Sequence, residues 1–323
     1  MQNTTHYNQR LNINELNNTA NLEEAIKNAE HLYISNLLGD EELLSSINSY
    51  LKKYNKKLWL SLNKSTEMNQ ENLIQLRYLT NVKKLKIIVF NGFIEDLSEL
   101  SHIDDLEEFT IYNNVKKGIS LVPLAKFKNL SSLSLYTGLT IKQYAVLNTF
   151  EKLEHLSARE IDFSKLNNLP IKELTVDSKF IHSDLIAEKF ANIEYISLQN
   201  CKDVSIENIA SLPVVSDVRL RYMPHITRLA SFKNKENIFH LECVHLKNLE
   251  NIEALFELKQ LKYLMITDLE KLKAEDFYRL KELPNLKVAY ITFKNAKEND
   301  KFITFANTHN WIYKQPSLAK TIL

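Results

Sequence analysis

Glycine is scarce in this chain, with residues only at Gly39, Gly92, Gly118 and Gly138, which stand far apart. Phosphate-cradling loops and dinucleotide fingerprints need glycines clustered within a few residues. The spacing therefore excludes a local nucleotide-binding loop. No His-x-x-x-His, Cys-x-x-Cys or calcium-loop spacing occurs either. We accordingly assign no catalytic residue, no metal and no cofactor.

An excess of one charge and long apolar runs are also lacking. Lys and Arg number 41 against 40 Asp and Glu, which leaves no net field to attract nucleic acid or an anionic membrane. No run approaches the roughly 18 apolar residues of a membrane span, and the N-terminus lacks an apolar segment of signal-peptide length. We expect no nucleic-acid partner, no membrane partner and a cytoplasmic location.

The chain contains instead a recurring phrase of three apolar residues, as in Leu130-x-x-Leu133-x-Leu135 and Leu261-x-x-Leu264-x-Ile266. The second apolar residue falls at Leu32, Leu58, Leu85, Phe109, Leu133, Leu156, Leu174, Ile196, Val218, Leu241, Leu264 and Ala289. By subtraction the steps run from 18 to 27 residues, and most lie within the range of leucine-rich repeats. A unit this short cannot bury its own apolar face, so neighbouring units must stack.

Over roughly residues 29–293 the chain resembles the leucine-rich-repeat family, as a divergent bacterial-type array. The family places Asn or Cys three residues after the last Leu of the phrase, and Asn114 and Cys201 fit that slot. Other units have Gly138, Ile161, Lys179, Met223, Leu246 or Leu269 there. Most of the asparagine ladder is therefore missing.

The predicted fold is α/β: a right-handed leucine-rich-repeat solenoid, or horseshoe. A parallel sheet forms the concave side, and short helices or 3₁₀ turns form the convex side. We expect an N-terminal cap over residues 1–28, a solenoid of about twelve units over 29–293 and a C-terminal cap over 294–323. Cys201 and Cys243 lie about two units apart, near 10 Å, so we expect reduced thiols.

Helical spacing of apolar residues predicts helices over 40–53, with Asp40 as N-cap, and over 69–79 and 274–283. The 18-residue step from Leu156 to Leu174 is too short for a regular helix, so we expect an extended or 3₁₀ connection there. At the ends, Leu11-x-Ile13 predicts a stray strand, residues 22–26 a short helix and residues 297–307 a helix. Trp311 and Tyr313 then alternate as a strand would.

Polar residues between the apolar anchors of each phrase should face solvent on the sheet side. Tyr and Arg dominate interface energies, although strands favour Tyr in any case. The partner-binding residues that we predict on the concave face are Tyr112, Tyr136, His155, Arg159, Tyr195, Arg219, Arg221, His240 and Tyr263. Glu242 and Met265 lie in the same slots as the later members.

Two other groups resemble catalytic sets. The run His182-Ser183-Asp184 has the residue types of a hydrolytic triad, but adjacent side chains point in different directions, which favours a solvated turn. The carboxylates at 104–105 and 107–108 favour a solvated rim over an acid/base pair.

We therefore predict no enzyme but a non-catalytic interaction scaffold that binds a protein or peptide on its concave face and is a monomer when free. A narrower version is a cytosolic immunity protein or antitoxin, or an adaptor. The alternative is a regulatory subunit, or an enzyme whose site lacks a recognisable motif. Resemblance to the repeat family favours the scaffold by analogy.

Overall fold

The computed structural model describes residues 10–15, 21–35 and 39–313. These residues form two compact units. Unit 1 comprises the described residues up to Arg159 together with Lys165–Leu169, and unit 2 comprises Glu160–Ser164 and the residues from Pro170 onward.

Each unit alternates strands with short helices and 3₁₀ turns. Unit 1 contains β1 (Arg10–Asn12), α1 (Leu22–Asn28), β2 (His31–Ile34), α2 (Glu41–Tyr54), β3 (Lys57–Asn63), α3 (Thr66–Asn72), β4 (Lys84–Asn91), β5 (Glu108–Tyr112), β6 (Ser132–Leu135), α4 (Ile141–Leu147) and most of β7 (His155–Asp162). Unit 2 contains β8 (Glu173–Ile181), α5 (Ile186–Lys189), β9 (Tyr195–Gln199), α6 (Ile206–Ala210), β10 (Asp217–Arg221), β11 (His240–Val244), β12 (Tyr263–Leu269), β13 (Val288–Phe293) and α7 (Ala296–Thr308).

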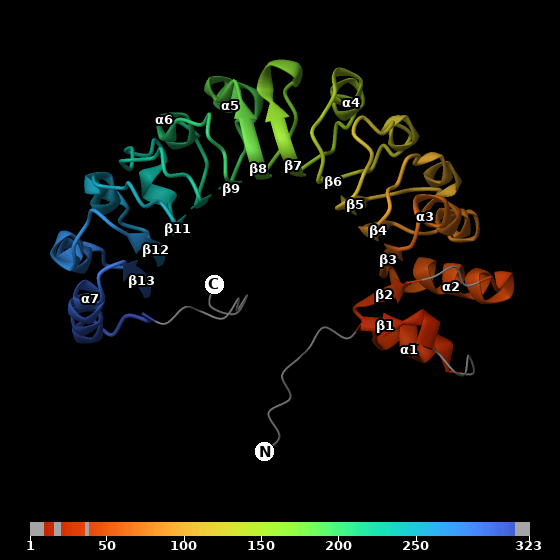
Figure 1. Cartoon of the computed structure of the whole chain (residues 1–323), viewed down its shortest axis with the longest axis horizontal. Helices are drawn as coiled ribbons and strands as arrows, with labels where there is room; N and C mark the ends of the chain where they lie inside the picture. The colour runs from red at the N-terminus through yellow and green to blue at the C-terminus, as the bar shows by residue number, and fades with distance from the viewer. Residues whose placement is uncertain (1–9, 16–20, 36–38, 314–323) are drawn as a thin grey trace. The chain divides into compact units, whose positions relative to one another are not determined.

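Strands pair in parallel and in sequence order, from β1 to β7 in unit 1 and from β8 to β13 in unit 2. In each unit the strands lie on the concave side, and the helices and 3₁₀ turns lie on the other (Figure 1). We call the strand side the strand face. This arrangement confirms the predicted leucine-rich-repeat solenoid, with its parallel sheet and its short helices and turns.

The core follows directly from the repeated phrase. The twelve anchor residues from Leu32 to Ala289 are each at most 2% exposed. Where the structure gives the register, neighbouring anchors pair across the sheet, for example Leu32 with Leu58 and Leu241 with Leu264. Each anchor thus stacks on its counterpart in the next repeat, which explains why apolar residues recur at one slot of every unit.

The turn after each strand compensates for the missing asparagine ladder. A residue with left-handed backbone directly follows β5, β9, β10 and β11, and another lies near the end of β12: Asn113, Asn200, Tyr222, His245 and Asp268. The backbone N–H of Asn200 donates to the carbonyl of Arg221, and that of Tyr222 to the carbonyl of Val244. Because these backbone groups bond directly to the next repeat, the following slot needs no side-chain amide, and in unit 2 it is filled by Cys201, Met223, Leu246 and Leu269.

The helix predictions are confirmed in one case and refined in two. The helix α2 begins after Asp40, whose Oδ1 accepts from the backbone N–H of Leu43 at 3.0 Å, as predicted. Over 69–79 the chain completes α3 and then becomes a 3₁₀ helix, Leu73–Tyr78, and Ala274–Glu282 is 3₁₀ throughout. A 3₁₀ helix rises about 2.0 Å per residue against about 1.5 Å in an α-helix, so fewer residues span the length of the repeat.

The short step after Leu156 contains a 3₁₀ helix at Phe163–Lys165, as expected. The predicted terminal strand is β1, which pairs with β2, and the predicted helices near the two ends are α1 and α7. Ile312 forms a parallel bridge with Val288. We propose that these end elements cap the repeat array; residues 1–9, 16–20 and 314–323 of the two predicted caps lie outside the described residues.

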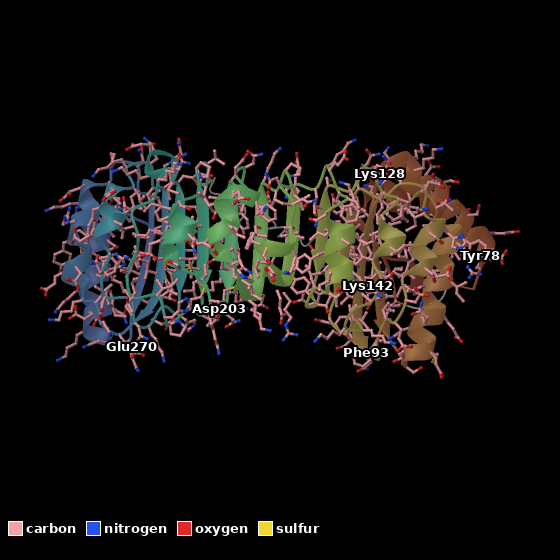
Figure 2. All side chains as sticks on the ribbon, turned by 90° about the horizontal axis from the view of Figure 1, so that it is seen from above. Tyr78, Phe93, Lys128, Lys142, Asp203 and Glu270 are labelled. Atoms are coloured by element: carbon pink, nitrogen blue, oxygen red, sulfur yellow. The ribbon has the colours of Figure 1, made fainter. Side chains whose placement is uncertain are left out.

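Both cysteines are buried and free, as predicted. Burial raises the pKa of Cys201 to about 11, so its thiol stays protonated at neutral pH. Outside the core, side chains such as Lys128, Lys142, Asp203 and Glu270 extend into solvent (Figure 2). Among the described residues, no helix combines the length and apolar character that a bilayer crossing requires.

Candidate functional site

The strand face of unit 2 carries polar and aromatic side chains in register on four neighbouring strands. Tyr195, Asp217, His240 and Tyr263 occupy one position on neighbouring strands. Ser197, Arg219, Glu242 and Met265 occupy the position two residues later. Strand alternation directs both positions to the strand face, since Val218 and Leu241 between them enter the core.

Two arginines on β10 are each held by a buried carboxylate. Arg219 donates from Nε and Nη2 to the two oxygens of Asp217, at 3.0 and 2.9 Å. Arg221 donates from Nε to Oε1 of Glu242 at 2.8 Å. The carboxylates are 7% and 6% exposed, while roughly a third of each arginine side chain stays exposed. The guanidinium groups are therefore fixed in orientation and still accessible.

Aromatic rings flank these pairs. The guanidinium of Arg219 lies over the ring of Tyr195, 4.9 Å from its centroid. On the next two strands, β11 and β12, His240 stacks on Tyr263 with 4.2 Å between the ring centroids. We call the set Tyr195, Asp217, Arg219, Arg221, His240, Glu242 and Tyr263 the arginine patch.

The His240 imidazole is buried at the centre of the arginine patch, and its ring nitrogens have no hydrogen bond among the described residues. Its Nδ1 lies 3.6 Å from Asp217 Oδ2 and its Nε2 lies 4.0 Å from Glu242 Oε2, which is too far for hydrogen bonding. Burial lowers the pKa of His240 to about 4, although the charge of Asp217 opposes this shift. The ring is therefore neutral at pH 7.

The structure brings together five of the residues predicted for partner binding: Tyr195, Arg219, Arg221, His240 and Tyr263. Asp217, which holds Arg219, was missed by the prediction. The signal that identifies it is positional, because it fills the same repeat slot as Tyr195, His240 and Tyr263.

The four predicted residues of unit 1 are less closely grouped. Tyr112 and Tyr136 make an edge contact, with 4.1 Å between their centroids, and Arg159 follows at the same repeat slot on β7. His155 lies four residues earlier on β7, about 13 Å along the strand. The tyrosine pair and His155 therefore belong to different parts of the strand face.

The expectation that polar slots face open solvent is wrong for several residues. Asp217, His240, Glu242 and Thr267 are each less than a tenth exposed, as are Ser61 and Ser197. Strands lie about 4.8 Å apart, so large neighbouring side chains cover one another on the concave side. Conversely, Phe90 and Phe93, at and beyond the end of β4, are 55% and 51% exposed, and the prediction did not identify them.

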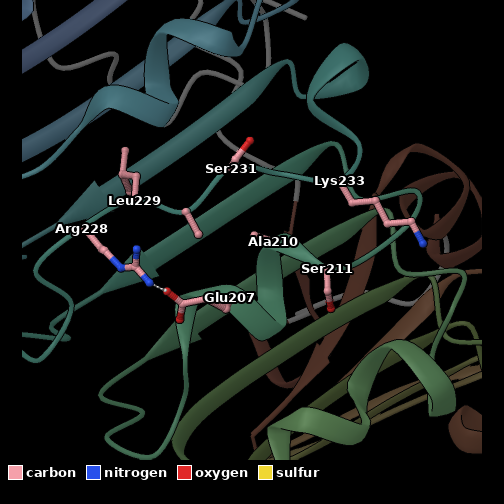
Figure 3. Close-up of a pocket in the computed structure, with 8 residues that line it drawn as sticks. Glu207, Ala210, Ser211, Arg228, Leu229, Ser231 and Lys233 are labelled. Carbon is pink, nitrogen blue, oxygen red and sulfur yellow. Dashed lines mark hydrogen bonds and ion pairs between the residues drawn. The ribbon is translucent and has the colours of Figure 1, made fainter.

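A hollow of about 470 Å³ in unit 2 lies beside α6 and the segment 228–233 (Figure 3). It is lined by Glu207, Ala210, Ser211, Arg228, Leu229, Ala230, Ser231 and Lys233, and Arg228 pairs with Glu207 across it. Its two hydroxyls are already engaged, Ser211 with the carbonyl of Asn208 and Ser231 with Glu257. The lining therefore presents neither an activated nucleophile nor a histidine base.

The other candidate catalytic sets are engaged in structural contacts. His182 Nδ1 lies 2.7 Å from Asp162, and Ser183 accepts from Asn208, so the triad-like run does not assemble. Glu107 pairs with Lys83, and Glu108 with Lys57 and Lys84. Within the described part of the chain, no group of three or more His, Cys, Asp or Glu is placed to hold a metal ion.

No protein-family model matches this sequence, and no curated protein matches it. Two solved structures align over most of the chain. An internalin of Listeria monocytogenes is 17% identical, with a TM-score of 0.37, covering 86% of this chain and 79% of the internalin. A leucine-rich-repeat protein of Leptospira interrogans is 16% identical, with a TM-score of 0.36, covering 93% and 99%.

Both TM-scores lie below 0.5, so we assign the fold from the strand order, the stacked anchors and the repeat register. On those observations the chain is a leucine-rich-repeat protein by fold.

Proposed function

We propose that this chain is a non-catalytic scaffold that binds a protein or peptide partner through the arginine patch of unit 2. The observation that carries the proposal is the pair of guanidinium groups held by the buried carboxylates of Asp217 and Glu242. Arg and Tyr concentrate binding energy at interfaces. Here Arg219 and Arg221 are already ordered before any partner arrives, which lowers the entropy lost on binding.

The charge of the patch favours a protein over a nucleic acid. Two arginines are balanced by two carboxylates, so there is no net positive charge to displace counterions from a phosphate backbone. A polypeptide can instead use the remaining N–H donors of the guanidinium groups for its carbonyls, and the Tyr195 and Tyr263 rings for apolar contact. In the narrower form of the proposal, the free protein is a cytoplasmic monomer that acts as an immunity protein or an adaptor.

The proposal is tested by site-specific photo-crosslinking in native lysate. A crosslinker replaces Val244, which follows Arg221 in register on β11, or, as control, the exposed Lys281 on the helix side. We expect a discrete partner band from position 244 and none from 281. Bands from 281 alone would place the binding site on the helix side and contradict the proposal.

A matched pair of variants tests the guanidinium groups. Arg221→Lys keeps the positive charge beside Glu242 but removes the planar donor fork. We expect it to weaken partner binding about tenfold or more with little change in thermal unfolding, since one interface ion contact of this kind is worth roughly 1.4 kcal/mol or more. Arg279→Lys, which changes an Arg–Glu pair on the helix side, should leave binding unchanged.

A further inference from the structure

A second cluster on the strand face lies in unit 1 and carries a net positive charge. Its members face outward from β1 to β5: Arg10, His31, Tyr33, Lys57, Trp59, Lys84, Lys86 and Glu108. We call this set the basic patch. It holds four cationic side chains and one carboxylate, in contrast to the balanced arginine patch.

The single carboxylate is shared. Glu108 forms ion pairs with two lysines, through Oε2 with Lys57 Nζ at 2.7 Å and through Oε1 with Lys84 Nζ at 3.0 Å. Lys86 has no ion pair among the described residues; burial, and then the charge of Lys57, lower its pKa. The charge of Glu30 raises the pKa of His31, but with this second carboxylate counted the patch still has a net positive charge. Residues 1–9, 16–20, 36–38 and 314–323 contain no Asp or Glu, so their side chains supply no further carboxylate.

Trp59 is enclosed between two of these side chains. The His31 ring stacks on the indole with 3.9 Å between centroids and 18° between planes, and Lys86 Nζ lies 4.4 Å from the indole centroid. A ring stacked at 3.9 Å leaves no room on that face, and β2 and β4 flank β3 on opposite sides, so Lys86 covers the other face. Neither face of the indole is open to a stacking base.

Two polar atoms in this sandwich have no hydrogen-bond partner among the described residues. They are Trp59 Nε1 and His31 Nε2, both buried, and His31 is only 6% exposed. A buried polar group left unsatisfied destabilises the state that contains it. The flexible Lys86 side chain is part of the cover, and rotation of lysine side chains requires no backbone movement. The patch thus offers hydrogen-bonding groups that a bound segment can satisfy.

We propose that the basic patch binds a carboxylate-rich segment of a protein partner, with Lys57, Lys84 and Lys86 pairing with Asp or Glu side chains. Lys86 rotates off the indole to reach its carboxylate, and the freed Trp59 N–H donates to the same segment. The site is separate from the arginine patch and does not depend on it. With Lys86 in place, both faces of the Trp59 indole are occupied, which disfavours base stacking. A single-stranded nucleic acid stacked on the face that Lys86 uncovers is the alternative that the oligonucleotide in the test decides.

The test is fluorescence polarisation with a labelled decaglutamate peptide and a labelled thymidine oligonucleotide of similar charge, at about 50 mM salt, where surface charges are weakly screened. We expect the peptide to bind, and Lys86→Glu to weaken it about tenfold or more, equivalent to roughly 1.4 kcal/mol. Lys142→Glu, an exposed charge reversal on α4, should change binding less than about twofold. Circular dichroism checks folding, and Lys86→Gln replaces the first variant if it unfolds.

A second readout isolates the indole. The chain has two tryptophans, Trp59 and Trp311, so in a Trp311→Phe background the emission reports on Trp59 alone. We expect the peptide to change this emission with the same affinity. Peptide binding unchanged by Lys86→Glu, no peptide binding at all, or tighter binding of the oligonucleotide would each overturn the proposal.

Discussion

At the residue scale, His240 is a buried imidazole that stacks on an aromatic ring and makes no side-chain hydrogen bond with the described residues. It lies against Tyr263, with Asp217, Arg219 and Arg221 acting on it from β10 and Glu242 from its own strand. Its 6% exposure leaves little solvent to stabilise a charge. The imidazole therefore keeps the patch neutral at physiological pH and makes unit 2 sensitive to acid.

We expect unit 2 to lose stability as the pH falls. The pKa of His240 drops from an ordinary 6.5 to about 4 on folding, so between these values the unfolded chain binds more protons. Protonation of His240 in the unfolded chain therefore leaves the free energy of unfolding almost unchanged above about pH 6.5. It lowers the free energy of unfolding by about 2 kcal/mol between pH 7 and pH 5. Urea unfolding at both pH values should show a smaller decline for His240→Phe than for the parent.

His102→Phe is the matched control, because His102 is an exposed side chain of unit 1. It should retain the parent's dependence on pH. An equal decline in the parent and His240→Phe would show that another group is responsible.

At the element scale, the tight turn after β4 determines where α3 can pack. Gly92 has φ +60°, and a Cβ there would lie 2.7 Å from the backbone N of Thr66 and 2.8 Å from the carbonyl O of Lys64. The approach is backbone to backbone, so no side-chain rotation relieves it. Gly92 therefore allows the end of β4 to lie against the start of the preceding helix, α3.

Gly92→Ala and Gly39→Ala separate steric from conformational effects. Gly39 has φ +65° with nothing within 4 Å of its Cβ position, so alanine there should lower the free energy of unfolding only by the left-handed penalty of about 1–2 kcal/mol. Gly92→Ala should lower it further, because the backbone must also move. Equal losses in chemical denaturation would contradict the close approach.

At the scale of the whole molecule, stability is built from contacts between neighbouring repeats. Within the described part of unit 2, β13 is followed by α7 and by a single parallel bridge from Ile312 to Val288, and α7 packs against β13. Phe302 of α7 is fully buried, with its ring 6.1 Å from that of Phe277 and 6.2 Å from that of Phe293. The helix thus covers the end of the last repeat with aromatic contact area.

Phe302→Ala should lower the free energy of unfolding of unit 2 by about 3–5 kcal/mol. Phe93→Ala, at a 51% exposed position, should change stability by no more than about 0.5 kcal/mol. Hydrogen exchange shows which strands lose stability. We expect faster exchange in β12 and β13 of Phe302→Ala and unchanged exchange in β3. Uniform acceleration through both units would instead show a single cooperative block.

The spacing of the apolar anchors specifies the repeat and therefore the fold. Anchors such as Leu133 and Leu264 can be buried only by stacking, so their spacing specifies parallel strands, and the cap at Asp40 specifies a helix. Tertiary structure alone decided the ion pairs of the arginine patch, the burial of His240 and the sandwich around Trp59. These depend on which side chains of adjacent repeats meet across about 4.8 Å, residues some twenty positions apart in the chain, and no local pattern encodes that contact.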